Sequence, residues 1–242
     1  VMLAARGSSD NAARYGQYLF GSINRLAVGL ATPSLFTLYQ TPPLLRKSLV
    51  IAISQSGQSP DICSIVEEAN RQGARSIALT NDTKSPLARE ADLCIDLSAG
   101  PETSIAATKT YTTSLLALAM LATYMADLKR LQGPIAGLPG KLEKFLENAG
   151  PISDVAQKYT NISNCITLGR GFNYATAHEI ALKLKELTYI LAEPYSSADF
   201  QHGPVAMVQG GFFVIVIAPR GKTAEEMSQF AGSLRTLGAR LL

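Results

Sequence analysis

The sequence contains an internal repeat, which constrains the fold more than any other feature. Arg6-Gly7 recurs as Arg170-Gly171, and Ile51-Ala52-Ile53 recurs as Ile215-Val216-Ile217, in both cases 164 residues later (6 to 170 and 51 to 215). A constant offset is typical of two copies of one structural unit. We therefore predict two domains of the same type, one after the other along the chain.

The repeated unit begins with a strand and continues into a helix. Leu49 to Ile53 are consecutive apolar residues rich in β-branched types, which is typical of a strand buried on both faces of a parallel sheet. Ser59 suits a helix N-cap, Pro60 the first helical position and Asp61 the first turn, where the helix dipole favours a negative charge. Ser8 to Asp10 are expected to cap an earlier helix in the same way.

Strands and helices alternate along the first copy. Strands are predicted near residues 2–5, 27–30, 49–53, 76–80 and 91–97, with helices over 8–26 and 59–72. This alternation predicts the α/β class: in each copy a doubly wound, flavodoxin-like parallel sheet with helices on both faces. The domains are expected at residues 1–131 and 151–242, with a linker at 132–150 that contains one helix.

The second copy is shorter than the first. Gly73-Ala74-Arg75 recurs as Gly238-Ala239-Arg240, and only two residues follow, whereas the first copy continues from Ser76 to about Leu128. The chain also opens inside an apparent strand. We therefore expect the second copy to be incomplete and the natural chain to extend beyond both ends of this sequence.

Composition excludes several classes of protein. Hydrophobic residues make up 47% and charged residues 17%, which excludes a largely disordered chain, and a net charge of +3 without a basic run argues against nucleic-acid binding. The longest apolar stretch, residues 114–125, is too short to span a membrane and is expected to form a buried helix. Three cysteines and two histidines without metal-ligand spacing predict no metal and a reducing, cytoplasmic compartment. No cofactor is predicted.

The loop after the strand at 49–53 is rich in hydroxyl groups. Ser54, Gln55, Ser56 and Ser59 lie beside a helix N-terminus, whose backbone N–H groups also favour an anion. The loop has neither a Walker sequence nor G-x-G-x-x-G, so a sugar phosphate fits better than a nucleotide. Taken alone, the loop is equally compatible with an ordinary Ser/Gly-rich turn. The second copy has Ala218-Pro219-Arg220 instead, so only the first domain is expected to bind phosphate.

The second domain carries charged residues on one helix face. Glu179, Lys183 and Glu186 follow the spacing i, i+4 and i+7. Such spacing usually marks a solvated salt-bridge ladder, which is the favoured interpretation if the pattern stands alone. His202 lies in a polar stretch, and a lone histidine in a loop is more often structural than catalytic.

Together these residues resemble the sugar isomerase (SIS) domain family, in particular the tandem-SIS isomerase part of glutamine:fructose-6-phosphate amidotransferases. The resemblance covers nearly the whole chain. Its motifs are Ser54-Gln55-Ser56-Gly57, Glu102 followed by Ala107-Thr108-Lys109, Leu168-Gly169-Arg170-Gly171, Glu179 to Glu186, and His202-Gly203-Pro204. The resemblance implies that a sugar phosphate is bound by Ser9, Ser54, Gln55, Ser56, Ser59 and Ala107.

The resemblance also implies roles for residues of the second domain. Glu186 would move a proton between C1 and C2 of the sugar, with support from Glu179 and Lys183. His202 would assist ring opening, reaching the site from a partner subunit of a homodimer. General chemistry agrees, because isomerisation needs a base beside a carbonyl or imine, and ring opening needs an acid/base that works near neutral pH.

Several reactions remain open within this family. Within these residues there is no glutamine-hydrolysing domain and no tail with an imine-forming lysine, so the preferred reaction is deamination and isomerisation of glucosamine 6-phosphate to fructose 6-phosphate and ammonia. The isomerase domain of the amidotransferase and a fructosamine-6-phosphate deglycase are alternatives. A non-catalytic sugar-phosphate sensor is the alternative from another class, although the presence of Glu186 and His202 counts against it.

Overall fold

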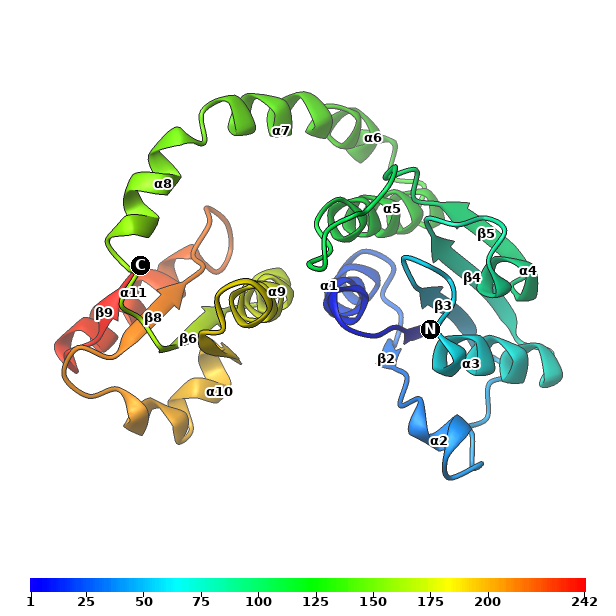
Figure 1. Cartoon of the computed structure of the whole chain (residues 1–242). Helices are drawn as coiled ribbons and strands as arrows, with labels where there is room; N and C mark the ends of the chain where they lie inside the picture. Colours follow the sequence, from blue (N-terminus) through cyan, green and yellow to red (C-terminus); the bar gives the residue numbers. More distant parts are fainter. The chain divides into compact units, whose positions relative to one another are not determined.

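Each half of the chain folds around its own parallel β-sheet. The computed structural model describes all 242 residues and divides them into two compact units, Val1–Ala122 and Thr123–Leu242 (Figure 1). The first sheet has the strand order β2-β1-β3-β4-β5 and the second has the order β7-β6-β8-β9. All neighbouring strands pair in parallel. The predicted fold class is therefore confirmed.

The first unit contains five strands and five helices. Its strands are β1 (Met2–Ala4), β2 (Gly29–Leu30), β3 (Leu49–Ile53), β4 (Arg75–Thr80) and β5 (Leu93–Asp96). Its helices are α1 (Ser8–Ile23), α2 (Ser34–Thr37), α3 (Pro60–Arg71), α4 (Pro86–Glu90) and α5 (Lys109–Met125), the last of which reaches past the boundary of the unit. Every strand predicted for the first copy is present, and β3 has the predicted bounds.

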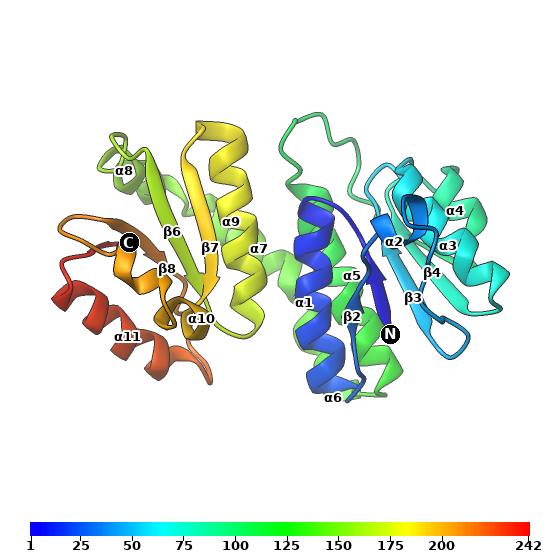
Figure 2. The ribbon, with the colours of Figure 1, turned by 90° about the horizontal axis from the view of Figure 1, so that it is seen from below.

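Helices cover both faces of the first sheet (Figure 2). Side chains alternate along a strand, so Ile51 and Ile53 point to one face of β3 while Val50 and Ala52 point to the other. The first pair packs in one buried cluster with α1 and α5, and the second pair packs in another with α3 and α4. All four side chains are buried. This burial on both faces explains why the strand is a continuous apolar run.

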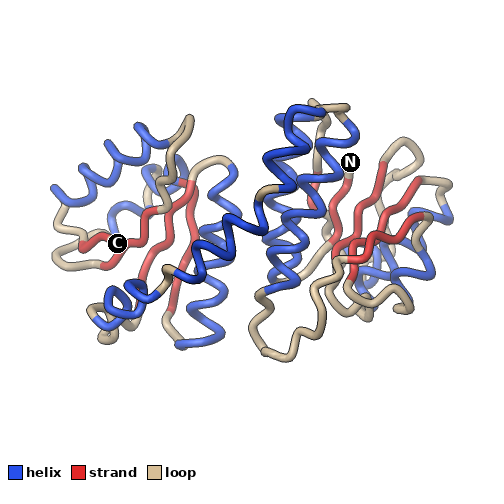
Figure 3. Tube along the Cα trace, turned by 90° about the horizontal axis from the view of Figure 1, so that it is seen from above, coloured by secondary structure: helices blue, strands red, loops and turns tan.

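The second unit repeats the strand order of the first. The strands of both sheets are drawn in red in Figure 3. Its strands are β6 (Asn164–Gly169), β7 (Leu191–Ser196), β8 (Phe213–Val216) and β9 (Arg240–Leu241). Its main helices are α9 (Phe172–Thr188), α10 (Ser197–Gln201) and α11 (Ala224–Thr236). The short 3-10 helix η1 (Pro204–Met207) follows α10. The order β7-β6-β8-β9 matches β2-β1-β3-β4, and β5 has no counterpart among these strands.

The two copies share an unusual turn between their first strand and first helix. Gly7 before α1 has φ 58° and ψ −133°, and Gly171 before α9 has φ 60° and ψ −128°. A Cβ atom disfavours positive φ, so both turns favour glycine. The prediction that Ser8 to Asp10 cap α1 is wrong, because the chain enters the helix at Gly7 and these residues form the first helical turn.

Three helices occupy the segment between the two sheets. They are α6 (Lys129–Ala136), α7 (Leu138–Glu147) and α8 (Gly150–Gln157), where the sequence had predicted a linker with one helix. Pro139 and Pro151 lie in the first turns of α7 and α8, where the missing N–H costs nothing. None of the three helices has a buried residue.

The apolar stretch 114–125 lies within α5. Leu118 and Ala122 are buried, whereas Met120 and Tyr124 are 54% and 81% exposed. The helix predicted to be buried is therefore buried on one face, while Met120 and Tyr124 lie on its exposed face. No helix of the chain is both long enough and apolar enough to cross a membrane.

Candidate functional site

The hydroxyl-rich loop 54–59 lies at the carboxyl end of β3, where it leads into α3. The Ser54 N–H donates to Leu79 O of β4 at 3.0 Å, which fixes the start of the loop. Ser54 Oγ accepts the Gly57 N–H at 3.2 Å, and Ser56 Oγ accepts the Gln58 N–H at 3.3 Å. In these bonds both hydroxyls are acceptors, so their rotatable hydrogens can be donated to an anion.

Gly57 brings this loop close to the start of α4. Its φ is +60°, and a Cβ atom at this position would lie 2.1 Å from Ser85 Oγ and 3.0 Å from Thr80 Oγ1. Ser85 is buried and caps α4 by accepting the Ala88 N–H at 3.3 Å. Ser85 was not among the residues predicted from the sequence, although Ser85-Pro86 has the same N-cap and first-position pattern as Ser59-Pro60 at the start of α3.

The entry into α3 agrees with the sequence prediction in all but one respect. Ser59 is at the N-cap, Pro60 is the first helical residue, and Asp61 lies in the first turn. The Ser59 side chain makes no capping hydrogen bond, so its hydroxyl is not occupied by the helix. Asp61 instead forms an ion pair with Arg6, which joins the turn after β1 to the first turn of α3.

Ser9 lies at the same edge of the sheet as the loop 54–59. It is in the first turn of α1, directly after β1, and β1 pairs with β3 along the residues Met2 to Ala4. The strand order reverses at this point, because β2 lies on one side of β1 and β3 on the other (Figure 2). Ligands of doubly wound sheets bind at such a reversal. The structure therefore brings Ser9 and the loop 54–59 to the expected end of the sheet.

Ala107 lies in the loop that follows β5 at this edge, just before α5. The loop is fixed by Glu102, whose Oε2 accepts the N–H groups of Thr108 and Thr110, both at 3.0 Å, and the Thr110 hydroxyl at 3.1 Å. The Thr110 N–H above all, followed by the Thr108 N–H, lowers the pKa of Glu102. Glu102 belongs to the motifs quoted from the sequence, but its contacts could not be deduced there.

In the second unit, α9 brings Glu179, Lys183 and Glu186 together. Lys183 Nζ lies 3.4 Å from Glu179 Oε1 and 2.8 Å from Glu186 Oε2. The side chains of Glu179 and Lys183 are only 9% and 21% exposed, while that of Glu186 is 31% exposed. A carboxylate and an ammonium this deeply placed do not form a solvated ladder, which would leave both in water.

His202, the residue predicted to assist ring opening, lies directly after α10 in the second unit. It is exposed and occupies the C-cap of α10, where its backbone N–H donates to Asp199 O at 3.1 Å. The structure does not pair His202 with the charged residues of α9. Its predicted role from a partner subunit remains a prediction.

The second unit retains the frame of the loop 54–59 but lacks hydroxyl groups at the positions of Ser54 and Ser56. Arg170 Nε lies 3.2 Å from Glu226 Oε1, and this pair joins the turn after β6 to the first turn of α11. It joins the same two elements of the repeat that the Arg6–Asp61 pair joins in the first unit. In the loop between β8 and α11, Ala218 and Arg220 stand at the positions of Ser54 and Ser56, and Thr223 stands at the position of Ser59. The two copies thus share a frame and differ in chemistry.

The chain is similar in sequence to a known domain family and to curated proteins. The SIS domain model matches residues 1–124 and 158–242. The chain is 34% identical over 251 residues to the glutamine--fructose-6-phosphate aminotransferase [isomerizing] of Clostridium tetani, and the match covers 100% of this chain and 41% of that protein. The chain therefore spans about two fifths of the length of this curated relative.

Two solved structures share the fold over nearly the whole chain. A crystal structure from Silicibacter pomeroyi, provisionally named as a phosphosugar isomerase, is 38% identical with a TM-score of 0.91, over 99% of this chain and 73% of that one. The C-terminal domain of glucosamine-fructose-6-phosphate aminotransferase from Francisella tularensis is 29% identical with a TM-score of 0.87, over 99% of this chain and 70% of that one. From the match of the SIS model to most of the sequence, with the fold that accompanies it, the chain belongs to the SIS domain family.

Proposed function

We propose that the chain is a phosphosugar isomerase that moves a proton between C1 and C2 of an amino-sugar phosphate. The observation that carries this proposal is the charged group on α9. Glu186 is accessible to a ligand, and Lys183, itself held by the buried Glu179, orients the Glu186 carboxylate from 2.8 Å. A charged carboxylate held in one orientation is suited to act as a general base on carbon.

One carboxylate can serve both proton transfers at carbon. Starting from open-chain glucosamine 6-phosphate, Glu186 takes the hydrogen from C2 as a proton while the aldehyde oxygen at C1 gains a proton from water, and an enolamine forms between C1 and C2. The same group returns the proton to C1, and the nitrogen gives up a proton to water, which leaves a neutral imine at C2 and a hydroxyl at C1. Water then hydrolyses the imine to fructose 6-phosphate and ammonia. Because C1 and C2 are adjacent, one positioned base serves both steps.

The remaining residues bind the substrate and prepare it. We assign the phosphate to the hydroxyl groups of Ser9, Ser54, Ser56 and Ser59 with the Gln55 amide, because neutral donors at a helix N-terminus suit an anion. The backbone around Ala107 is assigned to the sugar. His202 is assigned to ring opening, as an acid/base that a homodimer would supply from the partner chain.

The identity of the sugar is proposed from the relatives. The name glutamine--fructose-6-phosphate aminotransferase [isomerizing] of the relative at 34% identity supports fructose 6-phosphate and glucosamine 6-phosphate as the reacting pair. A catalyst accelerates a reaction in both directions. The same residues would therefore serve the deaminase preferred from the sequence and the amination that the relative's name describes.

The test is exchange of the C2 hydrogen of glucosamine 6-phosphate with deuterium oxide, followed by NMR. Glu186→Gln keeps the shape of the side chain and removes the base, so exchange should fall by at least about 100-fold. Replacing Ser54 and Ser56 together by alanine should weaken binding of the sugar phosphate in calorimetry, since each donor to a charged group is worth about 1.5 to 3 kcal/mol.

Glu143→Gln is the matched control, because Glu143 is exposed on α7. It should exchange like the unmodified protein. Wild-type exchange in Glu186→Gln would return α9 to a purely structural ion-pair network. Binding without any exchange in the unmodified protein would favour the sugar-phosphate sensor, and release of ammonia during exchange would favour the deaminase.

A further inference from the structure

Asn81 connects two loops of the first unit that come from different strands. It follows β4 directly, and its backbone N–H donates to Gln55 O in the loop after β3 at 3.0 Å. Its side chain turns to the loop after β5, where Nδ2 donates to Gly100 O at 2.8 Å and Oδ1 accepts the Ala99 N–H at 2.9 Å. One residue therefore holds the start of the loop 97–108 beside the loop 54–59.

The far end of the loop 97–108 is held by a second contact. Glu102 accepts the N–H groups of Thr108 and Thr110, so the residues on either side of Ala107 are tied to the start of α5. The loop thus has two anchors, the Asn81 amide at Ala99 and Gly100 and the Glu102 carboxylate at Thr108. Between them lies the backbone that the proposed function assigns to the sugar.

We propose that Asn81 is a positioning residue that holds the loop 97–108 against the loop 54–59, so that the sugar and the phosphate are bound by one preformed surface. This inference rests on the proposed function for its ligand, but not for its contacts. The side-chain amide suits the role because it donates and accepts at once in a fixed geometry, which hydroxyl and carboxylate groups do not reproduce. A loop held in its bound conformation also loses less entropy on binding.

The key variant is Asn81→Ala, which removes both side-chain bonds and keeps the backbone bond to Gln55. The loop 54–59 should then stay in place while the loop 97–108 is released. We expect the dissociation constant for glucosamine 6-phosphate to rise by about tenfold, the effect of about one lost neutral hydrogen bond. The dissociation constant for inorganic phosphate should stay within about twofold of the unmodified protein, because the hydroxyl loop is unchanged.

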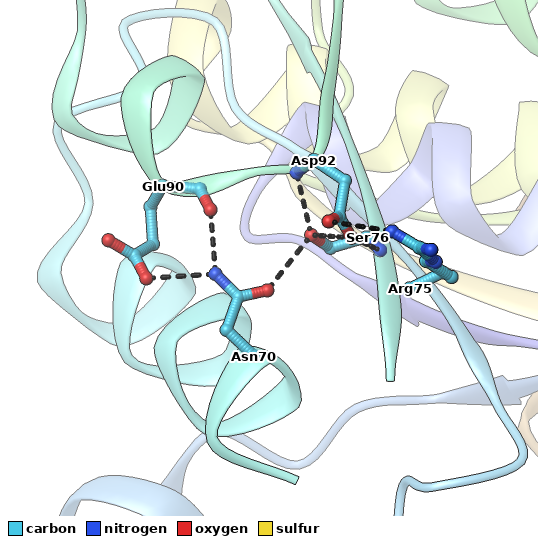
Figure 4. Close-up of polar contacts among 5 residues, drawn as sticks. All are labelled: Asn70, Arg75, Ser76, Glu90 and Asp92. Atoms are coloured by element: carbon cyan, nitrogen blue, oxygen red, sulfur yellow. Dashed lines mark hydrogen bonds and ion pairs between the residues drawn. The ribbon is translucent and has the colours of Figure 1, made fainter. Parts of the chain in front are cut away.

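Asn70→Ala is the matched control for stability (Figure 4). The Asn70 side chain also bridges backbone elements of the first unit, donating to Glu90 O at 2.7 Å and lying 3.3 Å from Ser76 Oγ, but at the opposite edge of the sheet. The variant Asn70→Ala should lower thermal stability as Asn81→Ala does. It should leave the dissociation constants for glucosamine 6-phosphate and for inorganic phosphate unchanged. Asn81→Asp keeps the acceptor for Ala99 and loses the donor to Gly100, so its affinity for the sugar phosphate should be reduced as well.

Amide hydrogen exchange without ligand gives a readout that does not depend on the proposed function. If Asn81 positions the loop, exchange at Thr108 and Thr110 should accelerate in Asn81→Ala, while exchange at Gly57 stays slow. Unchanged protection at Thr108 would overturn the proposal, and so would equal losses of affinity for sugar phosphate and inorganic phosphate. If the unmodified protein binds no sugar phosphate, the proposed function fails, and the exchange at Thr108 still decides the role of Asn81.

Discussion

Gly57 is the single residue on which the close packing of the proposed phosphate loop depends. Its φ of +60° disfavours any residue with a Cβ, and the added atom would overlap the Ser85 hydroxyl at 2.1 Å. Gly57→Ala should therefore destabilise the first unit by about 3 kcal/mol, the sum of backbone strain and overpacking. Chemical denaturation of the full chain measures this loss.

Gly73 provides the matched control for Gly57→Ala. Gly73 also has a positive φ, of +73°, but nothing lies within 4 Å of the Cβ position. Gly73→Ala should cost only the backbone term, about 1 kcal/mol. Equal destabilisation in the two variants would mean that the loop shifts to accept the methyl group, and that contact with Ser85 does not fix it.

The candidate site residues that are predictable from the sequence are those with a local signal. Ser54, Ser56 and Ser59 were recognisable because hydroxyl groups follow a buried strand and precede a proline that starts a helix. Asn81 was not recognisable, because its partners lie 26 residues before it and 18 and 19 residues after it. A hydrogen bond between distant loops leaves no periodicity in the sequence, so only the fold reveals it.

At the scale of elements, a polar cluster joins α3, β4, the end of α4 and the start of β5 (Figure 4). Asp92 Oδ2 accepts the Ser76 N–H at 2.8 Å, and the Asp92 N–H donates to Ser76 Oγ at 3.0 Å. The Ser76 N–H above all, with the Ser76 hydroxyl and Arg75 as further causes, lowers the pKa of Asp92. This reciprocal pair sets the register in which β5 begins beside β4.

The lowered pKa gives Asp92 a predictable effect on stability. A carboxylate whose pKa is lower in the folded state stabilises the fold above its unfolded pKa, about 3.9, and this stabilisation is lost as pH falls through the folded value. Asp92→Asn should therefore lower the urea midpoint of the first unit at pH 7, and the difference should shrink towards pH 3. NMR signals from β3 and β4 follow this unfolding.

Asp154→Asn is the control for the Asp92 experiment, since Asp154 is exposed on α8 outside the first unit. It should leave the midpoint of the first unit unchanged at every pH. A deficit in Asp92→Asn that is as large at pH 3 as at pH 7 would show that the amide fails for steric reasons, independent of charge.

Elements were predictable from the sequence where one signal dominated. The bounds of β3 could be predicted because the strand is buried on both faces and is therefore a continuous apolar run. Strand β7 was missed because Glu193 and Pro194 interrupt any strand pattern. Proline is tolerated there since β7 is an edge strand, with β6 as its neighbour. Composition alone could not anticipate that position in the sheet.

At the scale of the whole molecule, the three helices between the sheets are expected to be its least stable regular structure. Helices α6, α7 and α8 bury no residue, and short helices without packing are marginal in water. Backbone amides of α7 should therefore exchange with solvent at least about 100-fold faster than those of α3, which buries five residues such as Ile62 and Val66. Equal protection in α7 and α3 would mean that a second chain covers α7.

The ion pairs Arg6–Asp61 and Arg170–Glu226 each fix the anchor points of the neighbouring loop without using any residue of that loop. Each pair ties the first turn of a sheet to the helix that ends the loop, so the sequence between strand and helix can change while the anchor points stay. After a gene duplication, the two copies could come to differ at the serine positions, where the second has Ala218 and Arg220, at little cost to the fold. By the same logic, a protein engineer could graft residues 54–59 onto positions 218–223 and give the chain a second hydroxyl-lined cradle.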